Sequence, residues 1–138
     1  MYRFSAKSAG NISQCVLPLQ RLAYAVIREL DCTAVTGYRG KIRQERRFKA
    51  GTSNAHWKES PHNYKPAYAL DLVPYLPGIG ATWQERQAYY FAGQVKQIII
   101  QLALPIITGA DFDNDNNVLD QTFIDPCHFE IEYWKDLI

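Results

Sequence analysis

The run Asp125-Pro126-Cys127-His128-Phe129-Glu130 near the end of the chain sets a histidine and two carboxylates into a strand-like pattern. Side chains alternate between the two faces of a strand, so the segment Cys127 to Tyr133 turns Phe129 inward and His128 toward a polar face. A cleft can lie on that polar face. Asp125 stands three residues before His128, just outside the predicted strand. This run therefore predicts both a strand of the sheet and one wall of a site.

A second cluster, Ser60-Pro61-His62 through Ala69-Leu70-Asp71, supplies the matching chemistry. Asp71 falls among small alanines on one face of the strand expected over 67–74, which leaves room for a metal ion rather than for a packed side chain. If this strand lies beside the last one, Asp71 and His128 converge, and His62 joins them from the preceding loop.

Together, His62, Asp71 and His128 form the ligand set of a catalytic zinc site with three protein ligands and an open position. Asp125 is the spare carboxylate, able to take a proton from water and to pass it to a leaving amine. The alternative for each histidine taken alone is an ordinary surface or hydrogen-bonded residue. His56, six residues before His62, is a competing ligand candidate.

The whole pattern predicts an α+β fold in which helices flank a small antiparallel sheet. Helices are expected where apolar residues recur at spacings of three and four, and strands where β-branched or alternating residues lie between turns. The expected elements are helices over 17–30, 40–50 and from 82 to Pro105, strands over 32–38, 67–74, 106–108 and 127–133, a long loop over 51–66, a turn over 75–80 and an acidic loop over 111–120. The helix from 82 is expected to begin with the capping box Thr82-Trp83-Gln84-Glu85 and to bury Ala88, Phe91, Val95, Ile98, Ile99 and Leu102.

Length and composition favour one folded domain over residues 1–138, because a chain of 138 residues with 47% apolar content can bury a single core. A net charge of +1 gives no general case for nucleic acid or membrane binding. The longest apolar stretch, 98–107, is too short to span a bilayer, and the N-terminal residues show no signal-peptide pattern. The three cysteines are scattered, which favours small buried side chains in a reducing cytoplasm over disulfides.

The segments Ser60-Pro61-His62, Ala69-Leu70-Asp71-Leu72 and Asp125-Pro126-Cys127-His128 resemble the paired signatures of a peptidase family. This is the zinc D-Ala-D-Ala carboxypeptidase and L-alanyl-D-glutamate endopeptidase family, which shares its fold with Hedgehog signalling domains. The resemblance implies that the two histidines and Asp71 bind zinc and that Asp125 is the general base.

The resemblance extends upstream, where Gly37-Tyr38-Arg39 followed by Gln44 is similar to the family's Gly-Tyr-Arg segment. It implies that Arg39 stabilises the charge that develops on the attacked carbonyl, a role that suits a fixed guanidinium. The alternative for Arg39 is an ordinary surface arginine. One departure is the segment 63–68, which is longer than the commoner family spacing and has no glycine.

The family resemblance implies a small phage-type endolysin that uses Zn²⁺ to hydrolyse the stem peptides of peptidoglycan at the L-alanyl-D-glutamate bond. Such a protein is expected to be a monomer without a nucleic-acid partner or membrane insertion. It would be made in the host cytoplasm and would act on the cell wall in the periplasm after release through a pore made by another protein. The alternatives are a D-Ala-D-Ala carboxypeptidase or dipeptidase, and a non-catalytic wall-binding module that retains zinc.

An acidic loop offers a second metal site, because Asp111, Asp113 and Asp115 place oxygen atoms at alternating positions, as a calcium loop does. The glycine and glutamate of an EF-hand are replaced by Asn116 and Thr122, which excludes an EF-hand proper. The open alternatives are a partial or regulatory Ca²⁺ site and a solvated acidic turn.

Two further groups of residues have a functional and a structural interpretation. The basic run 41–49 could hold an anionic cell-wall polymer or be a solvated helix face. Trp57, Tyr64 and Tyr68 could line a substrate groove or act as packing anchors.

Overall fold

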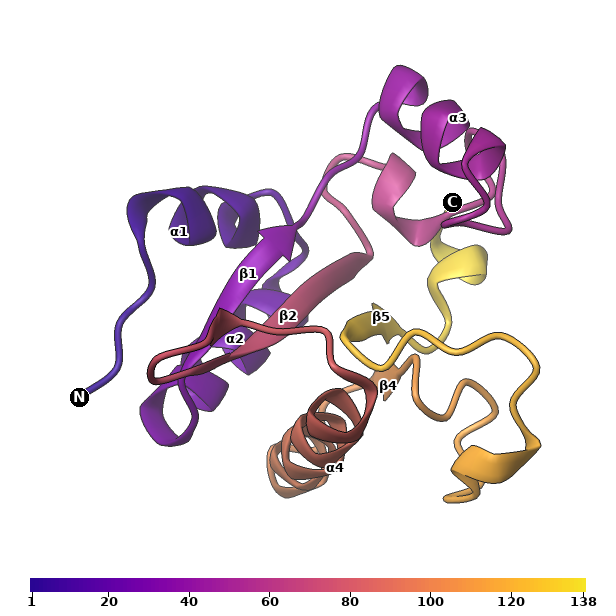
Figure 1. Cartoon of the computed structure of the whole chain (residues 1–138). Helices are drawn as coiled ribbons and strands as arrows, with labels where there is room; N and C mark the ends of the chain where they lie inside the picture. The colour runs from indigo at the N-terminus through magenta and orange to yellow at the C-terminus, as the bar shows by residue number, and fades with distance from the viewer.

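The structure is a computed structural model that describes all residues from 1 to 138. Its elements in chain order are α1 (Ala6–Ser13), α2 (Leu17–Glu29), β1 (Cys32–Thr36), α3 (Lys41–Lys49), the 3-10 turn η1 (Pro61–Asn63), β2 (Ala69–Leu76), β3 (Gly80–Ala81), α4 (Glu85–Gln101), β4 (Ile106–Thr108), η2 (Val118–Asp120), β5 (His128–Ile131) and η3 (Trp134–Leu137) (Figure 1). None of the helices is both long and apolar enough to cross a membrane.

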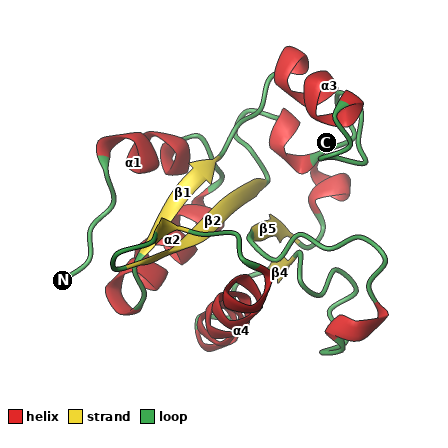
Figure 2. Ribbon diagram, viewed as in Figure 1, coloured by secondary structure: helices red, strands yellow, loops and turns green.

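The strands form one antiparallel sheet in the order β1-β2-β5-β4, and the short β3 pairs with the far end of β2. Figure 2 shows this sheet with α2 against it and α4 alongside. The predicted α+β class, with helices flanking a small antiparallel sheet, is confirmed. The central pair, β2 and β5, joins the two sequence clusters that carry the candidate site.

The main hydrophobic core lies between the sheet and the helices α2 and α4. Alternation along β5 sends Phe129 into this core, where its ring meets Phe91 of α4 edge-on at 6.5 Å between centroids. The residues on either side of Phe129, His128 and Glu130, therefore face the opposite side of the sheet. The core fixes which face of β5 is left for the site.

Several details differ from the sequence-based predictions; the strands expected over 32–38 and 127–133, for example, are the shorter β1 and β5. The expected turn over 75–80 is shorter, because β2 continues to Leu76 where β3 supplies hydrogen-bond partners. The second long helix is capped by Gln84, whose side chain accepts from a backbone amide of the first turn, while Thr82 only binds the Gln84 amide. Leu102 was expected in the buried stripe but lies beyond the helix end and is 39% exposed.

Helix α1, which was not predicted, protects the edge of the sheet formed by β1. The Ser8 hydroxyl accepts a hydrogen bond from the Ala34 amide, and the Asn11 amide group donates to the Ala34 carbonyl. These polar contacts satisfy backbone groups of β1 that would otherwise lack partners. Because α1 binds through polar side chains, it has few of the regularly spaced apolar residues that identify a helix in sequence.

The three cysteines are all free and buried, as their scattered positions predicted. Burial is the main cause that raises the pKa of Cys15, Cys32 and Cys127 to about 12 each. Since the thiolate is the reactive form, we expect almost no modification of the folded protein by a thiol reagent at pH 8. In denaturant, all three thiols should react; rapid reaction of a thiol in the folded protein would contradict this packing.

Candidate metal centre

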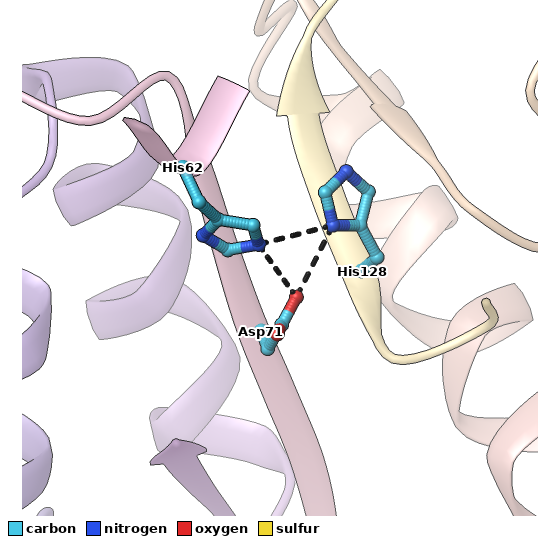
Figure 3. A group of neighbouring side chains, drawn as sticks. All are labelled: His62, Asp71 and His128. Atoms are coloured by element: carbon cyan, nitrogen blue, oxygen red, sulfur yellow. Dashed lines mark hydrogen bonds and ion pairs between the residues drawn. The ribbon is translucent and has the colours of Figure 1, made fainter. Parts of the chain in front are cut away.

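Three side chains from separate segments converge on one point: His62 from η1, Asp71 from β2 and His128 from β5 (Figure 3). Nε2 of His62 lies 3.1 Å from Oδ1 of Asp71 and 3.2 Å from Nδ1 of His128. Nδ1 of His128 lies 3.2 Å from the same Asp71 oxygen. The structure thus brings together the three residues that the sequence singled out as metal ligands.

The register of the central strand pair places two of these ligands. Asp71 in β2 and His128 in β5 are directly opposite each other. Opposed residues of an antiparallel pair project from the same face with their Cβ atoms about 4.5–5.5 Å apart. A one-residue slip would send His128 into the core and Phe129 to the site, so core packing and site geometry select the same register.

A short, tightly bonded turn delivers the third ligand. The Ser60 hydroxyl accepts from the His62 amide, and the Asn63 side-chain oxygen accepts from the Ser60 amide, which closes η1 as a capping box. The lengthened segment 64–68 that follows contains a cis peptide bond before Pro66. The longer connection to Asp71 does not displace His62, whose side chain is almost completely buried.

The outward-facing nitrogen of each histidine is already engaged. Nδ1 of His62 donates to the Gly37 carbonyl at 2.7 Å, and Nε2 of His128 donates to Oε1 of Glu130 at 2.8 Å. Carbonyl and carboxylate oxygens only accept, so these contacts fix the hydrogens on the outer nitrogens and turn the inner ones toward Asp71. Outer partners of this kind are typical of metal-binding histidines. The donor set therefore fits a metal ion.

The electrostatics of the cluster also favour a positive charge at its centre. Burial opposes ionisation of Asp71, but the charges and hydrogen bonds of His62 and His128 hold its pKa well below the usual range. Burial acts to lower the pKa of His128, yet its hydrogen bonds to Asp71 and Glu130 outweigh this and raise it to about 10. An ionised carboxylate between two buried imidazoles attracts a cation to the point between them.

Arg39 is not a surface arginine, since it is only 4% exposed. Its Nη2 lies 3.7 Å from Oδ2 of Asp71, and its Nη1 donates to the side-chain oxygen of Gln44. Its Nε is buried and has no hydrogen-bond partner. Arg39 also lines the cavity over the metal ligands, so the structure places a guanidinium beside the site.

Gln44 is the one buried residue of α3, and it connects Arg39 to the His62 turn. Its side-chain oxygen accepts from both Arg39 and Asn63, and its amide nitrogen donates to the Ser53 hydroxyl and the Ala55 carbonyl. Every polar atom of the Gln44 side chain is therefore satisfied. This network fixes the guanidinium and the metal-binding turn relative to each other.

Two residues of the cluster, His62 and His128, line a cavity of about 570 Å³. The cavity is lined by Arg39, Arg47, Thr52, Ser53, Asn54, Ala55, Glu59, Ser60, Pro61, His62, Phe112, Asp113, Asp120, Gln121, Thr122, Phe123, Asp125, His128, Glu130, Trp134 and Lys135. In Figure 1, α3 lies above β5 and the loop between β4 and β5 lies below it, and both contribute lining residues. A cavity of this size accepts a segment of a peptide.

Asp125 lines this cavity beside His128, and its carboxylate makes no hydrogen bond or ion pair with another residue. Burial, with a contribution from the negative charge of Asp71, raises its pKa, against the lowering effects of His128, His62 and Arg47. A half-buried carboxylate with a raised pKa and free oxygens can exchange protons with a bound molecule. The role of Asp125 as the general base stays a prediction.

Gly109 allows the Asp125 loop to pack against β5. Its amide donates to the His128 carbonyl and its carbonyl accepts from the Asp125 amide. A Cβ at this position would lie 2.1 Å from the Asp125 carbonyl oxygen and 3.1 Å from Cβ of His128. Gly109→Ala is therefore expected to lower the free energy of unfolding by about 1–3 kcal/mol and to weaken metal binding.

The matched control is Gly93→Ala in α4, where an added Cβ meets nothing within 4 Å. This substitution should raise the free energy of unfolding by about 0.5–1 kcal/mol, because alanine favours a helix over glycine. Denaturant unfolding of the metal-free proteins measures the change in the free energy of unfolding for both variants. Equal stability of the Gly109→Ala variant and the parent would contradict the close packing at this glycine.

The acidic loop brings Asp111, Asp113 and Asp115 close enough together to hold a metal ion. The Lys96 ammonium donates to Asp111 at 2.9 Å and to Asn116 at 2.7 Å, so a cation already binds part of this group. The backbone amides of Asp115 and Asn116 also donate to Asp111. Calcium binding at this loop stays a prediction.

Of the two interpretations of the aromatic residues near the site, the structure supports packing anchors for Tyr64 and Tyr68 and a place in the cavity lining for none of the three. Trp57, Tyr64 and Tyr68 do not line the cavity; its aromatic residues are Phe112, Phe123 and Trp134. Tyr64 and Tyr68 pack against the main core instead.

The competing ligand His56 is also remote from the cluster. It pairs with Glu45 at 3.0 Å and its ring packs on Phe48. Glu130 and Asn63 contribute to the site without having been predicted. Alternation along the last strand did place Glu130 on the His128 face, but nothing local indicated that it would bind this ring.

Comparison with known proteins agrees with this architecture. The chain matches the structure of Serratia marcescens L-Ala D-Glu endopeptidase ChiX with a TM-score of 0.74 and 20% sequence identity, over 99% of this chain and 94% of that one. That likeness shows a shared fold. No curated protein matches the chain. Residues 1–132 match the family described as phage L-alanyl-D-glutamate peptidase, and the chain belongs to this family of peptidoglycan hydrolases.

Proposed function

We propose that the chain is a zinc peptidase that hydrolyses the L-alanyl-D-glutamate bond of peptidoglycan stem peptides, with His62, Asp71 and His128 as its metal ligands. The observation that carries the proposal is the donor set itself. Two buried imidazoles turn their free nitrogens toward one carboxylate oxygen, while their outer nitrogens are held by Gly37 and Glu130. Nitrogen and oxygen donors of this number and kind suit Zn²⁺ in a catalytic site.

Zinc bound at this position would polarise the scissile carbonyl and make a water molecule more acidic. Asp125 is the residue that transfers the proton. A carboxylate oxygen of Asp125 accepts a proton from the attacking water and then donates it to the nitrogen of the leaving amine. Its raised pKa brings the carboxylate closer to the range in which both transfers are efficient.

Glu130 is the other carboxylate near His128, and its contacts suit a different task. Its Oε1 accepts from Nε2 of His128 at 2.8 Å, so it orients the ring and raises the basicity of the ligand. Asp125 has no such partner and is the carboxylate free to act on substrate.

Arg39 stabilises the negative charge that develops on the carbonyl oxygen. Its guanidinium is fixed by Gln44 and lies beside Asp71, so it needs little rearrangement when charge appears. The buried Nε of Arg39 has no hydrogen-bond partner within the protein. Fixed donors in a water-poor site stabilise a developing oxyanion more strongly than the same groups do in water.

The test is the digestion of purified sacculi with and without a chelator, followed by mass spectrometry of the soluble products. New L-alanine carboxyl ends and D-glutamate amino ends, lost with chelator and restored by zinc, would support the proposal. Release of terminal D-alanine would instead show the D-Ala-D-Ala carboxypeptidase or dipeptidase activity, and binding without cleavage would show a wall-binding module.

We also propose that the chain acts as a single-domain monomer, made in the host cytoplasm and active on the wall after release. All residues of the site come from one chain, and one large core joins α2, α4 and the sheet, which supports this. Light scattering after size-exclusion chromatography tests the monomer, and a single cooperative unfolding transition tests the single domain.

A further inference from the structure

Arg47 differs from the other cations of the basic helix α3. It is the one member of the run 41–49 that lines the cavity. Its exposed side chain makes no hydrogen bond and no ion pair, while its backbone carbonyl accepts from Thr52 and Ser53. A guanidinium that faces a cavity without a carboxylate partner is available to an anionic ligand.

The neighbouring Arg39 gives independent support for an anion on this side of the cavity. It is nine-tenths buried, and its Nε has no partner. Arg39 and Arg47 line the same cavity, so an anion bound on this side can lie near both guanidinium groups.

We propose that Arg47 binds the free carboxylate of the glutamyl residue on the leaving side of the scissile bond. This inference rests on the proposed function, because that bond defines the substrate. A glutamyl residue joined through its nitrogen carries two carboxyl groups, and only one of them continues the peptide. The other is a free anion near the scissile nitrogen, and the planar guanidinium of Arg47 can bind it through two parallel hydrogen bonds.

Lys135 is the competing cation, since it also lines the cavity and has no ion pair. Its ammonium lies over the Trp134 ring, 5.7 Å from the centroid. The one buried donor without a partner belongs to Arg39, which lies on the α3 side of the cavity with Arg47. The other charged side chains that line the cavity include the carboxylates Glu59, Asp113, Asp120, Asp125 and Glu130, which would repel a carboxylate. The α3 side is therefore the favoured place for the anion.

The experiment compares two synthetic stem peptides that differ only in that group, one with the free carboxylate and one with a carboxamide. For the zinc-loaded wild type, kcat/KM should be about 10- to 100-fold higher with the carboxylate peptide. Arg47→Gln should remove most of this preference by lowering kcat/KM for the carboxylate peptide alone. Arg46→Gln makes an equal change of charge at the neighbouring residue, which is also exposed but does not line the cavity, and it should leave the preference intact.

Binding provides a readout that does not depend on which bond is cut. Calorimetric titration of the zinc-loaded Asp125→Asn protein should show the same preference for the carboxylate peptide, and Arg47→Gln added to it should abolish that preference. Equal affinity for the two peptides, or a preference that Lys135→Gln removes and Arg47→Gln does not, would overturn the assignment. Cleavage at another bond would refute the proposed function, while the affinities would still decide the role of Arg47.

Discussion

Asp125→Asn is expected to lower kcat for peptide cleavage by about 10²- to 10⁴-fold, the usual contribution of a general acid–base group. Asparagine has nearly the same shape, but it cannot accept the proton of the attacking water. Because Asp125 forms no contact with the metal ligands through its carboxylate, zinc should stay bound at the wild-type level. Steady-state kinetics on a stem peptide and the zinc content of the purified variant measure the two effects.

The matched control is Glu130→Gln, which alters the other carboxylate near His128. Glutamine at this position can still accept a hydrogen bond from the ring but lacks the negative charge. Metal affinity should fall by about 10- to 100-fold, as is typical when an outer partner of a ligand is changed, while activity at saturating zinc is largely kept. Full activity in Asp125→Asn, or a larger loss of kcat in Glu130→Gln, would contradict the assignment of the general base.

Asp71→Ala is expected to abolish both zinc binding and cleavage. The substitution removes the only anionic ligand and leaves two buried imidazoles and the Arg39 guanidinium without their shared carboxylate. The loss of metal affinity should exceed the roughly 10- to 100-fold cost of losing an outer partner. Titration of the metal-free protein with zinc, monitored by calorimetry, measures it.

Asp31→Ala is the control for this change, since Asp31 adjoins the far end of β1, where Cys32 pairs with Pro74. It should bind zinc and cleave the substrate as the parent does. Retention of zinc at wild-type affinity by Asp71→Ala would show that the metal binds elsewhere in the chain.

The strands that carry the ligands could be predicted because the alternation of side chains along each strand was sufficient to identify it. Alternation placed Phe129 and His128 on opposite faces, and the core confirms this division. The small residues around Asp71 indicated a site with space for an ion. These features depend on residues one or two positions apart, and a strand determines on which face each of these side chains lies.

The features that sequence could not supply depend on contacts between distant segments. Gln44 lies in a basic, exposed helix, and only the folded chain shows that it joins Arg39 to Asn63. Gly109 is required because the Asp125 backbone passes against it, which no neighbouring residue in sequence indicates. The guanidinium of Arg39 likewise contacts Asp71, a residue 32 positions away in the sequence.

The coordination of zinc in the purified protein tests the central claim most directly. X-ray absorption spectroscopy should show two imidazole nitrogens at about 2.0–2.1 Å and carboxylate or water oxygens at about 2.0–2.2 Å. None of the three cysteines belongs to the ligand cluster, so no sulfur should appear at about 2.3 Å. A spectrum with sulfur ligands, or with fewer than two imidazoles, would contradict a metal centre built from His62, Asp71 and His128.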